Sequence, residues 1–266
     1  MEMGEKMFNK ITFISKDGIS LDGDVKDKIM SLFGDKDIGF VSFKDVTKEV
    51  LRNADLVITF GGDGTFVRAG NLIENAHIIG INSSPQTSEG ALTEININEL
   101  HLLDEIIKGN YKVEDIHRAK VKLNGKILDE NAVNEVYIGA NSHFHSARYV
   151  IKHNGEEEEH RSSGVIVTTG AGSKAWFKSA GGEPFGPNER KLSYVVREPY
   201  IGERVFKSKK IKGEILEGEK IIFESRRDFG GVIVINEAIY DFNTGDVAEI
   251  ELSDKPLKVI KLKNNQ

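Results

Sequence analysis

Residues 56–66 read LVITFGGDGTF, and this stretch decides the fold of the first part of the chain. Leu56–Phe60 is a short apolar run of the kind that forms a buried strand, and the segment from Phe66 to about Glu74 has a helical period. The glycine-rich turn Gly61–Thr65 lies between them. A strand, a turn and a helix in this order are typical of a parallel sheet wrapped by helices. The stretch therefore predicts an α/β domain.

The rest of the first hundred residues repeats this rhythm. Short apolar runs alternate with a helical period, at residues 11–14, 25–33, 38–43 and 77–81. A further amphipathic helix is expected to begin at the cap residue Asn98 and to stop at Gly109. Because strands and helices alternate throughout, we expect residues 1–112 to form the α/β domain.

After residue 112 the pattern becomes strand-like. Asn124-Gly125 and Asn154-Gly155 are strong signals for β-hairpins. Runs typical of strands follow at residues 133–138, 149–152, 165–169, 220–223, 232–235, 247–252 and 257–262. We therefore expect a β-rich second domain over residues 113–240, and the change of pattern is the sign of the boundary.

The composition narrows the class of protein. The chain has 266 residues, of which 39% are apolar and 29% are charged. It has no run of roughly 20 apolar residues, so we expect a soluble protein with no membrane partner. The length predicts two packed units, or one domain interrupted by another. The first residues carry acids and no apolar run, which favours a cytoplasmic location. The absence of cysteine excludes disulfides and thiolate metal sites, and a net charge of −6 argues against a nucleic-acid partner.

The turn Gly61–Thr65 is suited to an anion. Its three glycines leave room for a phosphate chain close to the backbone, and the helix that follows offers free N–H groups and the positive end of its dipole. Asp63 is an acid among these amides. It can hold a magnesium ion, orient a sugar hydroxyl or take its proton, and all three roles belong to phosphoryl transfer. The alternative is a tight structural turn in which Asp63 caps the next helix.

On an α/β domain, this turn resembles that of the superfamily joining NAD kinases, diacylglycerol and sphingosine kinases and, with a slightly different turn, phosphofructokinases. Asn134-Glu135 is similar to the Asn-Glu pair of NAD kinases, whose side chains are expected to hold the adenosine ribose. A carboxylate beside an amide suits recognition of a diol. Without the resemblance, the pair is equally compatible with a polar strand edge.

Thr168–Trp176, which reads TTGAGSKAW, is a third motif. It resembles the NAD kinase segment T-G-S-T-A-Y, and the positions in register are Gly172, Ser173, Ala175 and Trp176. By this resemblance, Ser173–Trp176 line the adenine and nicotinamide pockets. Three motifs in the order of the family favour NAD kinases within the superfamily.

The likeness extends to the mitochondrial-type branch of NAD kinases. The segments that carry it are Gly80–Pro85, Ser88–Gly90, Gly172–Trp176 and Val196–Pro199. Three positions depart from the usual family pattern. Ser163 stands where an acid is expected near the nicotinamide amide, so we expect the nicotinamide end to be held differently. Lys174 replaces a threonine and can meet substrate phosphate or pair with an acid, and Asn236-Glu237 replaces an Asp-Gly pair, which leaves its role open.

The resemblance implies an NAD kinase, which transfers the terminal phosphate of ATP or polyphosphate to the adenosine 2′-hydroxyl of NAD and gives NADP. Asp63 is the expected catalytic residue, as the base or the orienter for that hydroxyl. The expected binding residues are Gly61, Gly62, Gly64, Thr65, Asn134, Glu135, Ala171, Gly172, Ser173, Lys174, Ala175 and Trp176. The resemblance also implies Mg²⁺ bound with the donor, a homodimer or homotetramer, and a C-terminal segment over residues 241–266 that returns to the first domain. We expect no metal site built by the protein, because His143 and His145 lack an evident third ligand.

Two alternatives stay open at this point. A lipid or sugar kinase could share the glycine-rich turn, although the Asn-Glu and Gly-Ser-Lys-Ala-Trp segments do not support it. A non-catalytic dinucleotide-binding protein is suggested by the departures at Ser163 and Asn236-Glu237.

Overall fold

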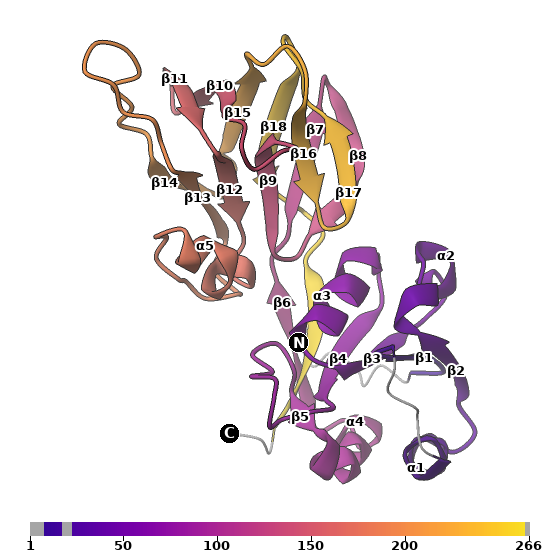
Figure 1. Ribbon diagram of the computed structural model, residues 1–266. Coiled ribbons are helices and arrows are strands. Elements are labelled where there is room, and N and C mark those ends of the chain that lie inside the picture. The colour runs from indigo at the N-terminus through magenta and orange to yellow at the C-terminus, as the bar shows by residue number, and fades with distance from the viewer. Residues whose placement is uncertain (1–7, 18–22, 264–266) are drawn as a thin grey trace. The chain divides into compact units, whose positions relative to one another are not determined.

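The computed structural model describes residues 8–17 and 23–263 (Figure 1). It divides the chain into two compact units. Unit 1 comprises Met1–Asp115 and Leu257–Gln266, and unit 2 comprises Ile116–Pro256. Along the sequence, unit 2 is therefore an insertion into unit 1. Among the described residues, no helix is long and apolar enough to cross a membrane.

The described residues of unit 1 form a seven-stranded sheet in the order β2-β1-β3-β4-β19-β6, with β5 paired to β4. The strands are β1 (Lys10–Ser15), β2 (Asp37–Ser42), β3 (Leu56–Gly61), β4 (His77–Asn82), β5 (Ile95–Asn96), β6 (Tyr111–Ile116) and β19 (Leu257–Leu262). Strands β1 to β5 and β19 pair in parallel. Parallel strands joined by helices confirm the predicted α/β class of this part.

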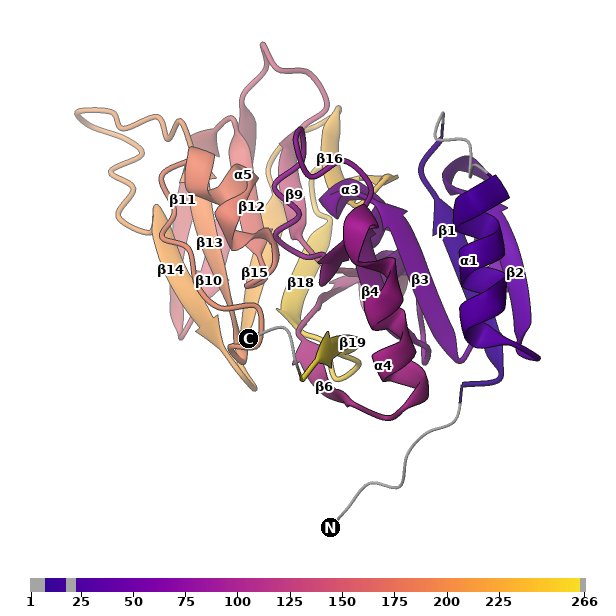
Figure 2. The same cartoon turned by 90° about the horizontal axis from the view of Figure 1, so that it is seen from below.

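Helices cover both faces of this sheet. They are α1 (Gly23–Phe33), α2 (Lys48–Leu51), α3 (Asp63–Leu72) and α4 (Asp104–Ile107). Figures 1 and 2 show α1 and α4 on one side of the sheet and α3 on the other. Ile29 of α1 and Ile106 of α4 pack in one core cluster with Ile58 of β3. Because the sheet is covered on both sides, every residue of β3 and β4 is buried, which is why their sequences are continuous apolar runs.

The described residues of unit 2 form two six-stranded antiparallel sheets. Their orders are β11-β10-β15-β18-β7-β8 and β14-β13-β12-β9-β16-β17. The strands are β7 (Ala119–Leu123), β8 (Lys126–Ala132), β9 (Glu135–Ala140), β10 (Ala147–His153), β11 (Glu156–Ser162), β12 (Gly164–Thr168), β13 (Lys191–Arg197), β14 (Lys212–Leu216), β15 (Lys220–Ser225), β16 (Gly231–Ile235), β17 (Ala238–Asp241) and β18 (Val247–Leu252). A short helix, α5 (Trp176–Ser179), follows β12. Buried residues of both sheets form one core, which confirms the predicted β-rich second domain.

Both predicted hairpin turns of unit 2 are present. Asn124 and Gly125 join β7 to β8, and Asn154 and Gly155 join β10 to β11. All four residues have positive φ, at 50°, 80°, 52° and 77°, as a two-residue hairpin turn requires.

Helix boundaries in unit 1 differ from the prediction. Helix α3 covers Asp63–Leu72, so it begins inside the glycine-rich turn and not at Phe66. The helix predicted from Asn98 to Gly109 is a 3₁₀ segment followed by the single turn α4, and its cap is Asn96. The reason is a capping box: the Asn96 side chain accepts from the Asn98 N–H, and Glu99 accepts from the Asn96 N–H.

The C-terminal part of the chain also divides differently from the expected boundary at residue 240. Strand β18 lies between β15 and β7 in a sheet of unit 2. The segment that returns to unit 1 begins at Leu257, where β19 pairs in parallel with β4. The Leu262 N–H donates to Glu94 at 2.9 Å, which also ties β19 to unit 1.

Candidate functional site

The turn Gly61–Thr65 lies at the carboxyl end of β3, beside the carboxyl end of β1. From β1 the chain passes through α1 to β2 on one side, and from β3 it passes through α3 to β4 on the other. In open parallel sheets, ligands bind outside the carboxyl ends of the strands where the connections diverge in this way. The fold therefore places the turn at the position where such sheets bind ligands.

The three glycines of the turn meet different surroundings. A Cβ at Gly61 would overlap the Thr65 hydroxyl, and a Cβ at Gly62 would lie 2.7 Å from Ser88 Oγ. Apart from its chain neighbours and the backbone of its own helix, no atom of the described residues lies within 4 Å of the Cβ position of Gly64. Close packing against Thr65 thus favours glycine at position 61, whereas a side chain at position 62 would have to displace the Ser88 hydroxyl. Gly64 leaves an open face at the N-terminal end of α3, where a ligand can approach the backbone.

The side chain of Asp63 does not cap its own helix. The cap position of α3 is Gly62, and within the described part of the chain no side chain bonds to the first turn as a cap. Instead, the Asp63 carboxylate accepts from two backbone N–H groups, from Leu92 at 2.8 Å and from Ala91 at 3.1 Å. The alternative of a helix-capping Asp63 is therefore wrong. The partners at Ala91 and Leu92 were not predicted from the sequence.

In unit 2 the structure brings the Asn-Glu pair and the Thr168–Trp176 motif together. Strand β9 pairs with β12, with Glu135 opposite Thr168. The Thr169 N–H donates to the Asn134 carbonyl at 2.9 Å. A Cβ at Gly172 would lie 2.5 Å from that same carbonyl oxygen. Gly172 is therefore the residue that lets the second motif lie against the first.

Two buried oxygens at this contact stand out. Among the described residues, no hydrogen-bond partner reaches Asn134 Oδ1 or Glu135 Oε2. Burial raises the pKa of Glu135 from its ordinary value to about 7. Buried polar atoms are nearly always paired, so unpaired ones in a native site call for a ligand or water. Acceptors on two consecutive residues suit hydroxyl groups of a ligand, which donate.

The residues of the 171–176 segment have different surroundings. Ser173 is fully buried, its hydroxyl accepts from the Phe185 N–H at 3.0 Å, and it lies 2.7 Å from the Gly170 carbonyl. Ser173 therefore holds the local loop together, whereas Lys174, Ala175 and Trp176 are exposed. Ala171, just before Gly172, is partly buried.

The exposed ring of Trp176 has two neighbours that the sequence did not single out. The Tyr137 ring lies 5.3 Å away between centroids, and the Arg197 guanidinium lies 4.8 Å from the indole centroid. The Tyr137 hydroxyl donates to the Ser163 carbonyl at 2.7 Å. The signal for Tyr137 was present in the period of two along a strand, because Glu135 and Tyr137 must share one face.

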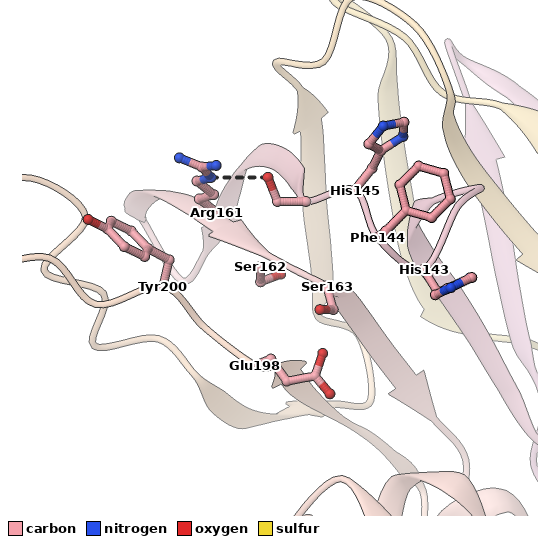
Figure 3. Close-up of a pocket in the computed structure, with 9 residues that line it drawn as sticks. His143, Phe144, His145, Arg161, Ser162, Ser163, Glu198 and Tyr200 are labelled. Atoms are coloured by element: carbon pink, nitrogen blue, oxygen red, sulfur yellow. Dashed lines mark hydrogen bonds between the residues drawn. The ribbon is translucent and has the colours of Figure 1, made fainter.

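Ser163 also lines a pocket of about 360 Å³ in unit 2 (Figure 3). The lining residues are His143, Phe144, His145, Ser146, Arg161, Ser162, Ser163, Glu198 and Tyr200. Arg161 Nε donates to Ser146 Oγ at 3.0 Å, as Figure 3 shows, and its guanidinium lies 5.6 Å from the Tyr200 ring centroid. The described residues contain no group of three or more His, Asp or Glu side chains that could hold a metal ion.

Asn236-Glu237, the position left open by the sequence, is a tight turn. The two residues join β16 to β17, and Asn236 has a φ of 57°. The positive φ explains why asparagine occupies position 236, because asparagine tolerates positive φ at hairpin turns.

Comparison with known proteins gives concordant matches. A sequence model of the ATP-NAD kinase N-terminal domain matches residues 2–111. The probable NADH kinase of Oryza sativa subsp. japonica is 30% identical over 241 residues, which cover 81% of this chain and 73% of that protein. The mitochondrial NAD kinase 2 of Homo sapiens is 24% identical over 301 residues, covering 82% of this chain and 67% of that protein. The crystal structure of an NAD kinase from Archaeoglobus fulgidus in complex with ATP has the same fold, with a TM-score of 0.75, 22% identity, and 96% and 95% of the two chains covered.

Proposed function

Because this chain belongs to the NAD kinase family, we propose that it transfers the terminal phosphate of ATP or polyphosphate to the adenosine 2′-hydroxyl of NAD. The product is NADP. The observation that carries the proposal is the pair of buried acceptors, Asn134 Oδ1 and Glu135 Oε2, beside the Gly172 turn. A ribose diol is the ligand group that would satisfy both.

Asp63 is the group that acts on the reacting hydroxyl. Each of its oxygens accepts one backbone N–H bond and keeps a lone pair for a further donor. The hydroxyl oxygen bonds to the terminal phosphorus, the bond to the bridging oxygen of the donor breaks, and Asp63 accepts the hydroxyl proton. The open backbone at Gly64 and the N-terminal end of α3 receive the negative charge of the donor phosphates.

Unit 2 supplies the residues for the dinucleotide. Asn134 and Glu135 accept from ribose hydroxyls of the dinucleotide other than the reacting 2′-hydroxyl, whose single proton goes to Asp63. The exposed faces of Ala175 and Trp176 receive the flat rings. Gly172 and Ser173 act by fixing the shape of the turn, and the exposed Lys174 is free to meet a substrate phosphate. The nicotinamide end lies near Trp176 and Ser163. Tyr137 connects these two residues, because its ring packs against Trp176 and its hydroxyl donates to the Ser163 carbonyl.

A magnesium ion fits this arrangement as part of the donor complex. The described residues offer no cluster of three or more metal-ligating side chains. Magnesium commonly binds through substrate phosphates with few protein ligands. When bound, it would neutralise charge on the transferred phosphoryl group.

Two further expectations belong to this proposal. We expect a homodimer or homotetramer, which light scattering of the purified protein would measure, and a cytoplasmic location, which imaging of a tagged chain would measure. Light scattering that gives a monomer would contradict the first expectation, and imaging that places the chain at a membrane would contradict the second. Neither result would bear on the proposed reaction.

The decisive experiment offers purified protein NAD or NADH, Mg²⁺ and either ATP or polyphosphate, and measures NADP or NADPH. Formation of the phosphorylated dinucleotide with one of the donors is the expected result. Tight binding of NAD without product from any donor would support a non-catalytic dinucleotide-binding protein. Parallel reactions with diacylglycerol and sugar acceptors identify a different kinase activity.

A further inference from the structure

Asn82, the last residue of β4, clamps the loop that follows it. Its side chain is 5% exposed, its Nδ2 donates to the Ser88 carbonyl at 2.9 Å, and its Oδ1 accepts from the Ser84 N–H at 3.0 Å. The Ser88 N–H donates in turn to the Ser84 carbonyl at 3.0 Å. One buried amide therefore closes residues 84–88 into a fixed loop.

The chain then passes directly over the same amide. Gly90 has a φ of +64°, and a Cβ at this position would lie 2.5 Å from Asn82 Nδ2. After it, Thr93 Oγ1 donates to the Gly90 carbonyl at 2.9 Å, and the Glu94 N–H returns to the Gly80 carbonyl at 2.8 Å. The path of the backbone between Gly90 and Glu94 is thus set from both sides.

This set segment is the one that holds the Asp63 carboxylate. The Ala91 and Leu92 N–H groups lie between the two anchors and donate to the two carboxylate oxygens, at 3.1 and 2.8 Å. The loop meets the glycine-rich turn at a second point, where Ser88 Oγ lies in the space that a Cβ of Gly62 would fill. Asn82, the loop and Asp63 therefore form one continuous chain of contacts within unit 1.

From these contacts we infer that Asn82 is a positioning residue for phosphoryl transfer, which acts on Asp63 through the backbone N–H groups of Ala91 and Leu92. The inference rests on the proposed role of Asp63 and adds a residue that does not touch substrate. Its physical reason is that a reacting group displaced by about 1 Å can lose about 100-fold in rate. A carboxylate held by two N–H donors is displaced when those donors move.

The first test is the Asn82→Ala variant. We expect kcat to fall by about 10- to 100-fold while the KM for NAD stays within about twofold, because the dinucleotide residues lie in unit 2. Asn82→Asp keeps the acceptor for Ser84 but cannot donate to Ser88, so it should restore part of the lost turnover. Wild-type kcat in Asn82→Ala would overturn the inference.

A matched control separates positioning from loss of stability. Asp55→Ala also removes a side chain that anchors backbone N–H groups in unit 1, those of Asn9 and Lys10, and Asp55 precedes β3 whereas Asp63 follows it. It should lower the melting temperature and leave kcat unchanged. Amide hydrogen exchange followed by NMR gives a readout independent of turnover: exchange at Ala91 and Leu92 should accelerate in Asn82→Ala and stay slow in Asp55→Ala. Unchanged exchange at these two amides in Asn82→Ala would contradict the inference.

A double-mutant cycle tests whether Asn82 acts through Asp63. In the Asp63→Asn background, adding Asn82→Ala should cause no further loss of turnover, measured at high enzyme concentration. If Asn82→Ala lowers turnover by the same factor in Asp63→Asn as in the wild type, Asn82 acts only through the folded fraction. That result overturns the role of Asn82 and leaves the role of Asp63 standing. Near wild-type turnover of Asp63→Asn itself overturns the proposed role of Asp63, so the two failures are distinguishable.

Discussion

Asp63 in unit 1 and Glu135 in unit 2 are both carboxylates beside glycine-rich turns, yet the two are held in opposite ways. Each oxygen of Asp63 accepts a backbone N–H, whereas Glu135 has a buried oxygen that no described residue reaches. Two carboxylates in one enzyme take different roles when their environments differ. The difference teaches that the Asp63 carboxylate is oriented by the protein itself, and that Glu135 keeps a buried oxygen for which we expect a ligand group to be the partner.

Removal of the Asp63 charge is expected to have the largest effect. Asp63→Asn should lower kcat by about 100- to 10,000-fold, since a positioned base contributes about that much, while the NAD affinity stays within a few-fold. Steady-state kinetics and calorimetry measure the two quantities. Asp24→Asn, which also neutralises an acid in the first turn of a helix, is the matched control. Turnover within a few-fold of wild type would remove Asp63 from the mechanism.

Removal of the unpartnered acceptors should instead affect binding. Asn134→Ala and Glu135→Ala should each weaken NAD binding by about 10- to 100-fold, because a ribose hydroxyl then loses its acceptor in a buried site. Titration calorimetry measures the change, with the exposed Glu157→Ala on β11 as the control. Unchanged NAD affinity in both variants would show that the ribose assignment is wrong.

The buried state of Glu135 also predicts how stability depends on pH. Its folded-state pKa is raised to about 7 from 4.5, so between these values the folded protein binds more protons than the unfolded chain. Stability from this group is therefore full below about pH 4.5 and is lost as the pH rises to about 7. The loss is at most about 3 kcal/mol.

Urea unfolding of wild type and Glu135→Gln at pH 5 and pH 8 measures this term. The glutamine variant carries no charge, so its stability relative to wild type should be higher at pH 8 than at pH 5. Equal differences at the two pH values would mean that Glu135 is not held in a desolvated state.

The smallest expected effect belongs to Trp176. Trp176→Leu should weaken NAD binding by about two- to tenfold, since a ring contact contributes that much. Trp176 is the single tryptophan of the chain and is 38% exposed, so its fluorescence should change when NAD binds to the wild type. Phe229→Leu, another exposed ring with an arginine beside it, is the control for binding. Fluorescence that NAD leaves unchanged would place the rings elsewhere.

The sequence predicted those parts of the site whose residues are neighbours along the chain. The turn Gly61–Thr65 and the pair Asn134-Glu135 carry their chemistry within a few positions, so a motif suffices to find them. The partners of Asp63 are backbone N–H groups of Ala91 and Leu92, 28 and 29 residues away. Every residue type except proline has such an N–H group, so no residue type marks these partners.

The limits of the fold prediction have a similar origin. Strands β18 and β19 have the same alternating, strand-like character, but one joins a sheet of unit 2 and the other the sheet of unit 1. The period of two along the sequence predicts that a segment is a strand, but it does not predict with which strand the segment pairs. The cap at Asn96 was missed for a related reason, because Asn96 and Asn98 are chemically equal candidates and Glu99 decides between them.

The place of β19 between β4 and β6 has a consequence during synthesis on the ribosome. Strands β4 and β6 are complete by residue 116, yet the strand that joins them emerges only with residues 257–262. At about 5 to 20 residues per second, the β4 edge at His77 and Ile78, where β19 will pair, and the β6 edge that faces β19 stay open for roughly 7 to 30 seconds. Unpaired strand edges can pair with other chains, so we expect this gap in the sheet of unit 1 to be the place where the nascent chain is open to wrong strand pairing.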